Sequence, residues 1–160
     1  MEIIMRILVV SDTHGRYQPL LDVVDKHPEA AMVLHCGDGE ADLRRLMEAY
    51  PQKRIFGVCG NNDFYSELPL SDVVTANGVR IYMTHGHTLR GGIDKLMARA
   101  REANAQIALY GHTHVAKAFY EDGLYVLNPG SLSRPRAGGK SYGIIDITNA
   151  GIMTNVVPYR

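Results

Sequence analysis

Short apolar runs alternate with amphipathic segments through the first two thirds of the chain, and this alternation limits the fold more than any other feature. The runs are rich in β-branched and aliphatic residues, as strands buried on both faces are. The segments between them carry apolar residues three and four positions apart, which is the spacing of an amphipathic helix. Strands that alternate with helices in this way predict an α/β fold. The predicted strands lie in residues 5–10, 30–38, 54–63, 78–87 and 106–114, and the predicted helices in residues 17–27, 40–50 and 91–104.

The pattern changes after the fifth run, where apolar residues alternate with polar ones around two turn signals. These signals are the sequences EDG and NAG, and they favour two β-hairpins. Residues 64–77, between the third and fourth runs, show no clear periodicity, so we expect an irregular segment there. Because no repeat, low-complexity tract or Pro- and Ser-rich linker interrupts the chain, residues 1–160 are predicted to form a single α/β domain.

Every predicted strand ends in side chains that commonly bind metal ions. In an open α/β sheet the carboxyl ends of the parallel strands lie along one edge, where ligands bind, so these side chains are expected to converge. Polar residues scattered over a surface would not follow the strand ends so regularly. The side chains concerned are Asp12, His14, Asp38, Asn61, Asp63, His85, His87, His112 and His114.

The chemistry of these side chains narrows the kind of site. Carboxylate, amide and imidazole ligands without a thiolate suit Mn²⁺, Fe, Ni²⁺, Co²⁺ or Zn²⁺, and they disfavour a structural zinc site built from cysteines. If Asp63 and His87 are left out, seven of these side chains remain. Seven ligands are too many for one ion, and they suit two ions that share a carboxylate. Paired ions ~3.5–4 Å apart catalyse in-line displacements, of which phosphoester hydrolysis is the leading case.

Five motifs, in this order, resemble those of the calcineurin-like metallophosphoesterases. They are SDTHG, CGDGE, GNND, THGH and YGHTH, which resemble the D-x-H, G-D, G-N-x-D/E, G-H and G-H-x-H blocks of that family. The short chain, the THGH motif and the later NPGS sequence resemble the YfcE-like phosphodiesterases most. The resemblance runs from Met5 to Arg136, and it implies a four-layer α/β/β/α sandwich of two mixed β-sheets flanked by helices.

The resemblance also implies a role for each motif residue. Asp38 would bridge two divalent metal ions, with Mn²⁺ as the first choice and Ni²⁺, Fe, Co²⁺ or Zn²⁺ as alternatives. We expect a hydrolase in which a hydroxide bridging the ions attacks phosphorus, with Asp38 and Asn61 as catalytic residues and no second carboxylate joining the ions. The first ion would be bound by Asp12, His14 and His114, and the second by Asn61, His85 and His112.

Simpler interpretations of single motifs stay open. His112 and His114 also suit a solvated turn, and Asn61 suits an Asx turn, which the sequence GNND would form by itself. The sequence NPGSLSRPR suits a loop that closes over the site, with Arg134 or Arg136 reaching a phosphate. It suits equally well a tight turn whose arginines are solvated.

One residue departs from the pattern of much of the superfamily. Many members have a histidine after the metal-binding asparagine, where it assists the leaving group, and this chain has Asn62 instead. Because an amide is no general acid near neutral pH, the departure favours substrates with good leaving groups. His87, two residues after His85, is our candidate for the missing catalytic donor. His27 and His35 are expected to be structural.

Composition disfavours several classes of partner and leaves three alternatives open. Lys and Arg together number 17, as do Asp and Glu, and the chain has no Trp and three Phe, which offers nucleic acid little charge or stacking. No apolar run suits a membrane span, and two cysteines outside any CxxC pattern indicate a reducing compartment, by default the cytoplasm.

The preferred substrate is a small phosphodiester or a nucleotide, and the resemblance suggests a homodimer. The alternatives are a phosphomonoesterase, a nuclease and a protein-binding scaffold like the retromer subunit of this fold.

Overall fold

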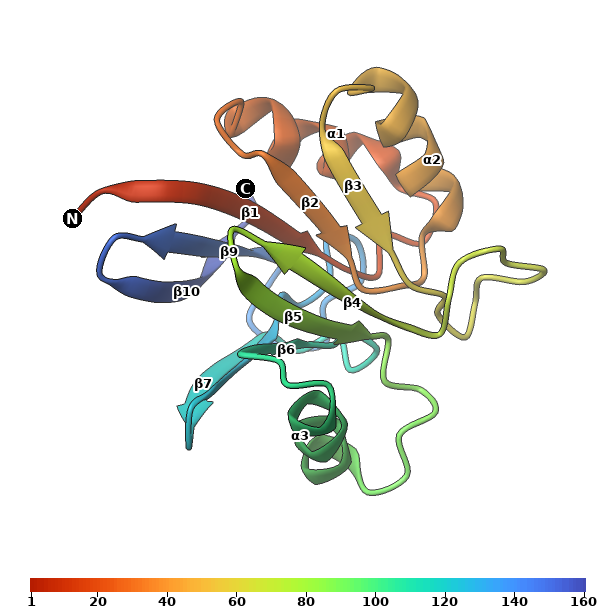
Figure 1. Cartoon of the computed structure of the whole chain (residues 1–160). Coiled ribbons are helices and arrows are strands. Elements are labelled where there is room, and N and C mark those ends of the chain that lie inside the picture. The colour runs from red at the N-terminus through yellow and green to blue at the C-terminus, as the bar shows by residue number, and fades with distance from the viewer.

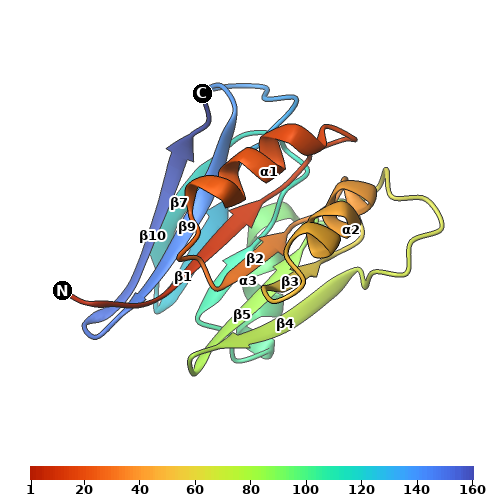
Figure 2. The ribbon, with the colours of Figure 1, turned by 90° about the horizontal axis from the view of Figure 1, so that it is seen from above.

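The computed structural model describes residues 1–160 as ten strands and three helices in four layers (Figures 1 and 2). Two five-stranded sheets lie face to face with helices outside them, which is the sandwich that the family resemblance implies. No helix has the length and apolar character needed to cross a membrane. The strands are β1 (Ile3–Val10), β2 (Met32–His35), β3 (Arg54–Gly57), β4 (Ser71–Ala76), β5 (Val79–Thr84), β6 (Ile107–Leu109), β7 (Lys117–Glu121), β8 (Leu124–Asn128), β9 (Ser141–Thr148) and β10 (Gly151–Pro158). The helices are α1 (Tyr17–Lys26), α2 (Glu40–Ala49) and α3 (Gly92–Glu102).

The first sheet has the strand order β10-β9-β1-β2-β3. Strands β1, β2 and β3 are parallel neighbours, and the helices α1 and α2 connect them in sequence. Strands β9 and β10 form an antiparallel hairpin that pairs with the other side of β1. Figure 2 shows α1 and α2 together over the face of this sheet. The predicted alternation of strands and helices and the predicted hairpin around NAG are therefore confirmed.

The second sheet has the strand order β4-β5-β6-β8-β7. Strands β5, β6 and β8 are parallel, whereas β4 and β7 are antiparallel edge strands. Helix α3 joins β5 to β6 and lies on the outer side of this sheet (Figure 1). The predicted hairpin around EDG is formed by β7 and β8. Each late hairpin thus completes one of the two sheets.

Strand β1 shows how one short apolar run serves two layers of the sandwich. Ile7 and Val9 belong to the core between the two sheets, whereas Leu8 and Val10 pack in the cluster under α1 and α2. All four side chains are fully buried. Burying one such side chain contributes roughly 1.5–3 kcal/mol, so a polar residue is disfavoured on either face. A third apolar cluster, which includes Leu96, lies between α3 and the second sheet.

The structure differs from the sequence-based expectation in residues 64–77. These residues, expected to be irregular, contain strand β4, which pairs with β5 through a turn at Asn77 and Gly78. Both turn residues have positive φ, as the Asn-Gly turn of a tight hairpin requires. The prediction was wrong because only Val74 and Ala76 of this short strand are buried, so its alternation is weak. The five predicted strands are divided between the two packed sheets, as the sandwich implied by the family resemblance requires.

The carboxyl ends of the parallel strands in both sheets nevertheless meet at one edge of the sandwich. The backbone N–H of His112, after β6 in the second sheet, donates to Oδ2 of Asp12, after β1 in the first sheet, at 3.1 Å. Within the first sheet, the N–H of Asp12 donates to the carbonyl of Gly37 at 2.9 Å. The loops that carry the predicted ligands are therefore held against one another across the two sheets.

Candidate metal centre

The first of two clusters contains Asp12, His14 and His114. Oδ1 of Asp12 lies 3.1 Å from Nε2 of His114 and 3.5 Å from Nε2 of His14. The two imidazole nitrogens are 3.3 Å apart. All three ligand atoms lie within 4.8 Å of one another, which allows a single cation to contact them together. These are the three residues that the resemblance assigns to one ion.

The second cluster contains Asp12, Asp38 and His85, whose ligand atoms also lie within 4.8 Å of one another. Nε2 of His85 is 3.2 Å from Oδ2 of Asp38 and 3.9 Å from Oδ1 of Asp12. Oδ1 of Asn61 lies 3.0 Å from the same Nε2 and 3.2 Å from Nδ1 of His112. The structure thus brings Asn61, His85 and His112 together beside Asp38. Asn61 and His112 are exposed, so the centre opens to solvent on this side.

Two carboxylates lie between the clusters. Oδ2 of Asp38 is 3.2 Å from Nε2 of His85 and 3.8 Å from Nε2 of His14, so it faces both groups of imidazoles. Oδ1 of Asp12 belongs to both clusters. The expectation that no second carboxylate can join the two groups is therefore wrong, because Asp12 reaches both of them.

Oδ1 of Asp12 is a buried oxygen without a hydrogen-bond partner. The other carboxylate oxygen, Oδ2, accepts hydrogen bonds from Oγ of Ser11 at 2.6 Å and from the N–H of His112 at 3.1 Å. A buried polar atom left unpaired is destabilising unless a proton donor or a cation satisfies it. Because imidazole nitrogens surround Oδ1 at ligand distances, the donor set fits a divalent metal ion at this point.

Two of the imidazoles are oriented by backbone carbonyl groups. Nδ1–H of His85 donates to the carbonyl of Cys36 at 2.7 Å, and Nδ1–H of His114 donates to the carbonyl of Arg134 at 2.6 Å. A neutral imidazole that is protonated on Nδ1 has its lone pair on Nε2. In the neutral ring the Nε2 lone pair therefore points towards the carboxylates and is open to a cation, which is the arrangement typical of metal-binding histidines.

The charges of the centre favour a cation. Burial lowers the pKa of His85, but the neighbouring carboxylates of Asp38 and Asp12 outweigh burial and raise it. Burial also opposes ionisation of Asp38, yet hydrogen bonds from His85 and Asn62 outweigh burial and lower the pKa of Asp38. Asn62 donates to Asp38 through both its backbone N–H and its Nδ2, at 2.8 and 2.9 Å. The two opposite pKa shifts show that positive charge between these groups is stabilised.

Five of the seven predicted ligands have a left-handed backbone. Residues other than glycine rarely adopt positive φ, and each such residue costs roughly 1–2 kcal/mol. Strain of this kind gathers at functional sites, where the surrounding structure maintains it. Sequence spacing gives no sign of it, because spacing shows residue types and not φ. The residues are Asp12 (φ 55°), His14 (φ 47°), Asp38 (φ 62°), His112 (φ 69°) and His114 (φ 60°).

Two motif glycines allow the strand ends to approach each other closely. A Cβ atom on Gly60 would overlap Oδ1 of Asp38 and would lie 2.5 Å from its backbone nitrogen. A Cβ atom on Gly111 would overlap Oγ of Ser11 and would lie 2.8 Å from Oδ2 of Asp12. Glycine is needed at both positions because any side chain would displace a carboxylate of the centre.

Asp63 does not face the imidazoles. Its carboxylate accepts hydrogen bonds from the backbone N–H groups of Asp38, Gly39, Glu40 and Gly60 at 2.8–3.1 Å. It thereby caps the start of α2 and holds the loop that carries Asp38. The position of Asp63 in the GNND motif predicts an acceptor for an imidazole or a loop amide, and the structure shows the loop amides as its partners.

His87 lies beside the second cluster and outside both groups of ligand atoms. Its ring centroid is 5.4 Å from that of His85 and 6.3 Å from that of His112. Nδ1 of His87 is buried without a hydrogen-bond partner. Burial lowers the pKa of His87, and the neighbouring His85 lowers it further. His87 is thus placed beside the second cluster without belonging to either cluster.

The arginines of the 128–136 loop contribute backbone groups to the centre. The carbonyl of Arg134 accepts the bond from His114, and the N–H of Arg136 donates to the carbonyl of His114 at 3.0 Å. Both side chains are exposed. Arg134 also lines a polar hollow of about 360 Å³ beside Asp38. The loop therefore positions His114, and a phosphate contact by either guanidinium stays a prediction.

The two remaining histidines outside the motifs are structural, as expected. His27 follows α1, and its Nε2 is hydrogen-bonded to the hydroxyl of Tyr142 at 2.9 Å. His35 is buried at the end of β2, where its Nδ1 accepts from the N–H of Gly37 and its Nε2–H donates to Oγ1 of Thr13, both at 3.0 Å. Burial lowers the pKa of His35. Both nitrogens of His35 are engaged, so it is no ligand.

Comparison with known sequences agrees with this geometry. Residues 5–150 match the family model described as the calcineurin-like phosphoesterase superfamily domain. The chain is 32% identical to Probable metallophosphoesterase YsnB of Bacillus subtilis over 150 residues, which is 91% of this chain and 86% of that protein. It is 37% identical to Phosphodiesterase YfcE of Escherichia coli over 68 residues, which is 42% of this chain and 34% of that protein.

Comparison with solved structures gives the same family. The crystal structure of a conserved Streptococcus pneumoniae protein, described as a predicted phosphoesterase, matches with a TM-score of 0.83 and 32% sequence identity. The match covers 97% of this chain and 90% of that one. The resemblance drawn from the five motifs is thereby confirmed. The chain belongs to the calcineurin-like phosphoesterase superfamily.

Proposed function

We propose that this protein is a metal-dependent hydrolase that cleaves phosphodiesters of small molecules or nucleotides. One observation carries the proposal: Oδ1 of Asp12, buried and without a hydrogen-bond partner, faces the imidazoles of two adjacent clusters. The names of the relatives, a metallophosphoesterase and a phosphodiesterase, support the same reaction class.

The proposed centre holds two divalent ions. Its oxygen and nitrogen donors suit Mn²⁺, our first choice, and they also suit Ni²⁺, Fe, Co²⁺ and Zn²⁺, so availability decides among them. Asp38 and Asp12 are the carboxylates that reach both groups of imidazoles. The proposed ligands of the two ions together are Asp12, His14, Asp38, Asn61, His85, His112 and His114.

Each part of the centre has a separate task in the proposed reaction. When bound, the two ions lower the pKa of water from ~15.7 towards ~7 and neutralise charge on the phosphoryl oxygens. The lowered pKa of Asp38 keeps this carboxylate ionised throughout the neutral pH range. The carbonyls of Cys36 and Arg134 hold the imidazoles of His85 and His114 in one orientation. Preorganised ligands of this kind need no rearrangement during the reaction.

We assign the leaving group to the side of the centre where His87 lies. Asn62, which stands where many relatives have histidine, uses both its backbone N–H and its Nδ2 to hold Asp38, so it is a positioning residue. Nδ1 of His87 is buried without a partner, so the atom that we propose as donor to a leaving oxygen is Nε2 of the same ring. His87 is therefore our proposed catalytic donor, with Asp38 and Asn61 at the reacting centre.

The alternatives predict different donors or partners. Binding a protein partner does not require a buried carboxylate oxygen that faces several oriented imidazoles, so the intact donor set favours an enzyme. The equal numbers of acidic and basic residues give a nuclease little affinity for a phosphate backbone. A cytoplasmic location is part of the proposal and is supported by the free cysteines Cys36 and Cys59. A homodimer stays a prediction.

The test compares bis(4-nitrophenyl) phosphate with 4-nitrophenyl phosphate, which share a leaving group, in Mn²⁺, Ni²⁺, Zn²⁺ and excess chelator. We expect faster hydrolysis of the diester, no activity in chelator, and loss of activity in Asp12→Ala and Asp38→Ala. Asp122→Asn, in the exposed turn between β7 and β8, is the control and should retain activity.

Three outcomes of this test would contradict the proposal. Faster turnover of the monoester would indicate a phosphomonoesterase. Activity that persists in chelator would exclude the metal-dependent reaction. Tight binding of metal without hydrolysis of either ester would favour the scaffold.

A further inference from the structure

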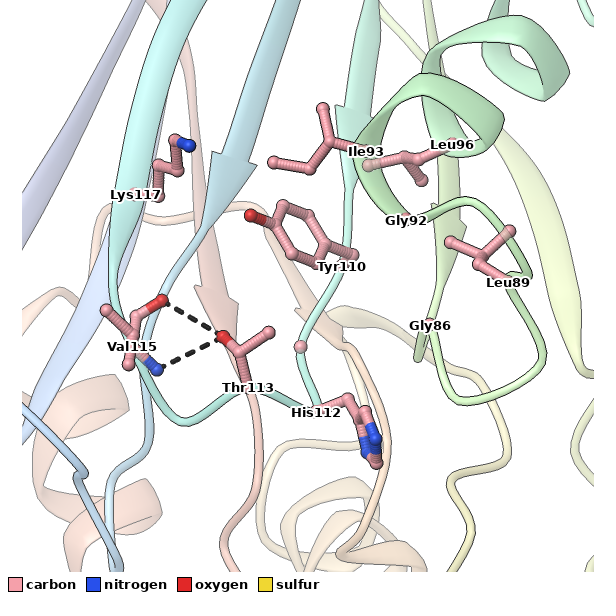
Figure 3. Close-up of a pocket in the computed structure, with 11 residues that line it drawn as sticks. Gly86, Leu89, Gly92, Ile93, Leu96, Tyr110, His112, Thr113, Val115 and Lys117 are labelled. Atoms are coloured by element: carbon pink, nitrogen blue, oxygen red, sulfur yellow. Dashed lines mark hydrogen bonds between the residues drawn. The ribbon is translucent and has the colours of Figure 1, made fainter.

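A cavity of about 440 Å³ opens beside the candidate metal centre on the side of His112 (Figure 3). Its walls come from two segments that are distant in sequence: residues 86–96, in the loop after β5 and the start of α3, and residues 110–117, from the end of β6 to the first residue of β7. The side chains that matter here are Leu89, Ile93, Tyr110, Val115 and Lys117. Figure 3 shows Leu89 and Ile93 on one side, Val115 and Lys117 on the other, and Tyr110 between them.

The lining offers few free polar groups. Oγ1 of Thr113 accepts from Nδ2 of Asn128 at 3.0 Å and from the N–H of Val115 at 3.2 Å, and it donates to the carbonyl of Val115 at 3.3 Å. Burial raises the pKa of Tyr110, so this side chain is an uncharged phenol at neutral pH. A group with many hydroxyls would lose hydrogen bonds to water on entering, whereas an apolar group would not.

His112 connects the cavity to the metal centre. It lines the cavity, and its Nδ1 also lies 3.2 Å from Oδ1 of Asn61. Its ring centroid is 5.1 Å from that of His85, in an edge-to-face arrangement. A substituent on a phosphorus atom held at this centre can therefore reach the cavity directly. The hollow on the opposite side, beside Asp38 and Arg134, is polar, so the two sides of the centre differ in chemistry.

We propose that this cavity binds one apolar ring of the substrate, so that the preferred substrates are phosphodiesters with an aryl ester group. This assignment rests on the function proposed above and names the substrate class of the same site. The aryl ring packs against Leu89, Ile93 and Tyr110, and the exposed amine of Lys117 stands at the outer end of the cavity. The polar hollow beside Asp38 accommodates the second ester group.

The kinetic test keeps the ester group that stays on phosphorus, methyl, constant and changes the leaving group, which lies on the His87 side of the centre. Methyl phenyl phosphate releases phenolate, methyl 2,2,2-trifluoroethyl phosphate releases a non-aromatic alkoxide, and each rate is divided by its uncatalysed rate. We expect this normalised kcat/KM for the phenyl ester to exceed that for the trifluoroethyl ester about tenfold or more, mainly through KM. In Ile93→Asn this ratio should fall towards one. Met153→Asn, on the distant strand β10, should leave the ratio and the activity unchanged.

A binding test separates the cavity from the reaction. Methyl(phenyl)phosphinate and dimethylphosphinate have two phosphorus–carbon bonds and no ester bond, so they are not hydrolysed, and calorimetry and the methyl resonances of Leu89 and Ile93 report binding alone. We expect the phenyl compound to bind about tenfold tighter to the Zn²⁺-loaded protein, whose diamagnetic ions leave these resonances observable, and to shift them. If Ile93→Asn does not fold, Leu89→Asn, in the loop before α3, replaces it.

The outcomes distinguish the two proposals. Tighter binding of the phenyl phosphinate without hydrolysis of any ester would retain the cavity and overturn the hydrolase. Hydrolysis of both esters with equal normalised kcat/KM and equal phosphinate affinities would retain the hydrolase and overturn the cavity. An Ile93→Asn or Leu89→Asn protein that is folded and keeps the full phenyl preference would also overturn it.

Discussion

Oδ1 of Asp12 lies 3.1 Å from Nε2 of His114, although Asp12 follows a strand of the first sheet and His114 follows a strand of the second. Within its own loop Asp12 has only His14 as a partner of this kind, at 3.5 Å. The centre therefore exists only when the two sheets pack in the observed arrangement. Because Asp12 also faces His85, one side chain links both clusters.

Replacing Asp12 by Asn should affect both clusters at once. The uncharged amide leaves the buried position beside His14, His114 and His85 without a negative ligand, so we expect Mn²⁺ affinity to fall at least about a hundredfold. Calorimetric titration should show two ions per chain in the unchanged protein and weak binding in Asp12→Asn. Asp122→Asn is the control. Retention of two tight sites in Asp12→Asn would contradict the proposed ligand set.

Gly60→Ala should weaken metal binding more than it weakens the fold. The new Cβ would overlap Oδ1 of Asp38 and must displace it. Gly123, in the turn between β7 and β8, has φ 83° and open space around it, so Gly123→Ala introduces backbone strain without touching the centre. We expect similar losses of thermal stability in the two variants and a loss of Mn²⁺ affinity in Gly60→Ala alone. Equal metal affinities would show that the close approach is not needed.

His87→Gln should reduce turnover mainly for diesters with poor leaving groups. A donor to the leaving oxygen matters most when the departing alkoxide is basic, and it contributes roughly 10²–10⁴-fold. The measurement is kcat for aryl phosphodiesters whose leaving-group pKa values cover several units. The slope of log kcat against that pKa should be steeper in His87→Gln than in the unchanged protein. Parallel lines would exclude His87 as the donor.

The metal-free protein should lose stability below pH 6.5 partly through His35. Its folded pKa is lowered by burial from an ordinary value of 6.5, and Nδ1 must stay unprotonated to accept the N–H of Gly37. The unfolded chain therefore binds the proton more readily, so this contribution is complete above pH 6.5 and is lost as the pH falls below it.

The test of His35 is urea unfolding in chelator at several pH values between 5 and 7.5. In His35→Asn, which keeps an acceptor at the δ position, the fall in unfolding free energy should be smaller by up to about 1.4 kcal/mol per pH unit. Comparing the pH dependence of the His35→Asn protein with that of the unchanged protein removes the contribution of other groups. One of these is His85, whose raised pKa acts in the opposite direction. Identical pH dependences would contradict this assignment.

Arg6 and Asp146 should stabilise the first sheet as a pair. They are opposite residues of β1 and β9, and the guanidinium binds the carboxylate in a bidentate manner, at 2.8 and 2.9 Å. Arg6→Met leaves the buried carboxylate unpaired, so we expect a loss of about 2–3 kcal/mol in unfolding free energy. Adding Asp146→Asn should recover part of that loss. The result to compare is the loss of stability caused by Asp146→Asn alone. If Asp146→Asn causes the same loss in the Arg6→Met protein, the two side chains do not interact.

Several elements were predictable because the residues within one short stretch of the chain determine them. Helix α3 and the hairpins around EDG and NAG have strong periodicity and clear turn residues, and all three occur where they were expected. Strand β4 was not predicted, because only Val74 and Ala76 of it are buried and it is stabilised mainly by pairing with β5. This strand forms because it pairs with β5, and the residues of β4 by themselves do not show that pairing.

For the centre, the sequence by itself determined the donor types and the strand ends that carry them. The order of the five motifs along the chain was enough to indicate the family. Only the tertiary structure decided how these donors combine: Asp12 serves both clusters, Asp63 caps α2, and the carbonyls of Cys36 and Arg134 orient two imidazoles. The apolar cavity beside His112 is likewise assembled from two segments that are distant in sequence. The reason is physical: a ligand atom acts through its distance and direction to other atoms, and these are fixed when two sheets pack together.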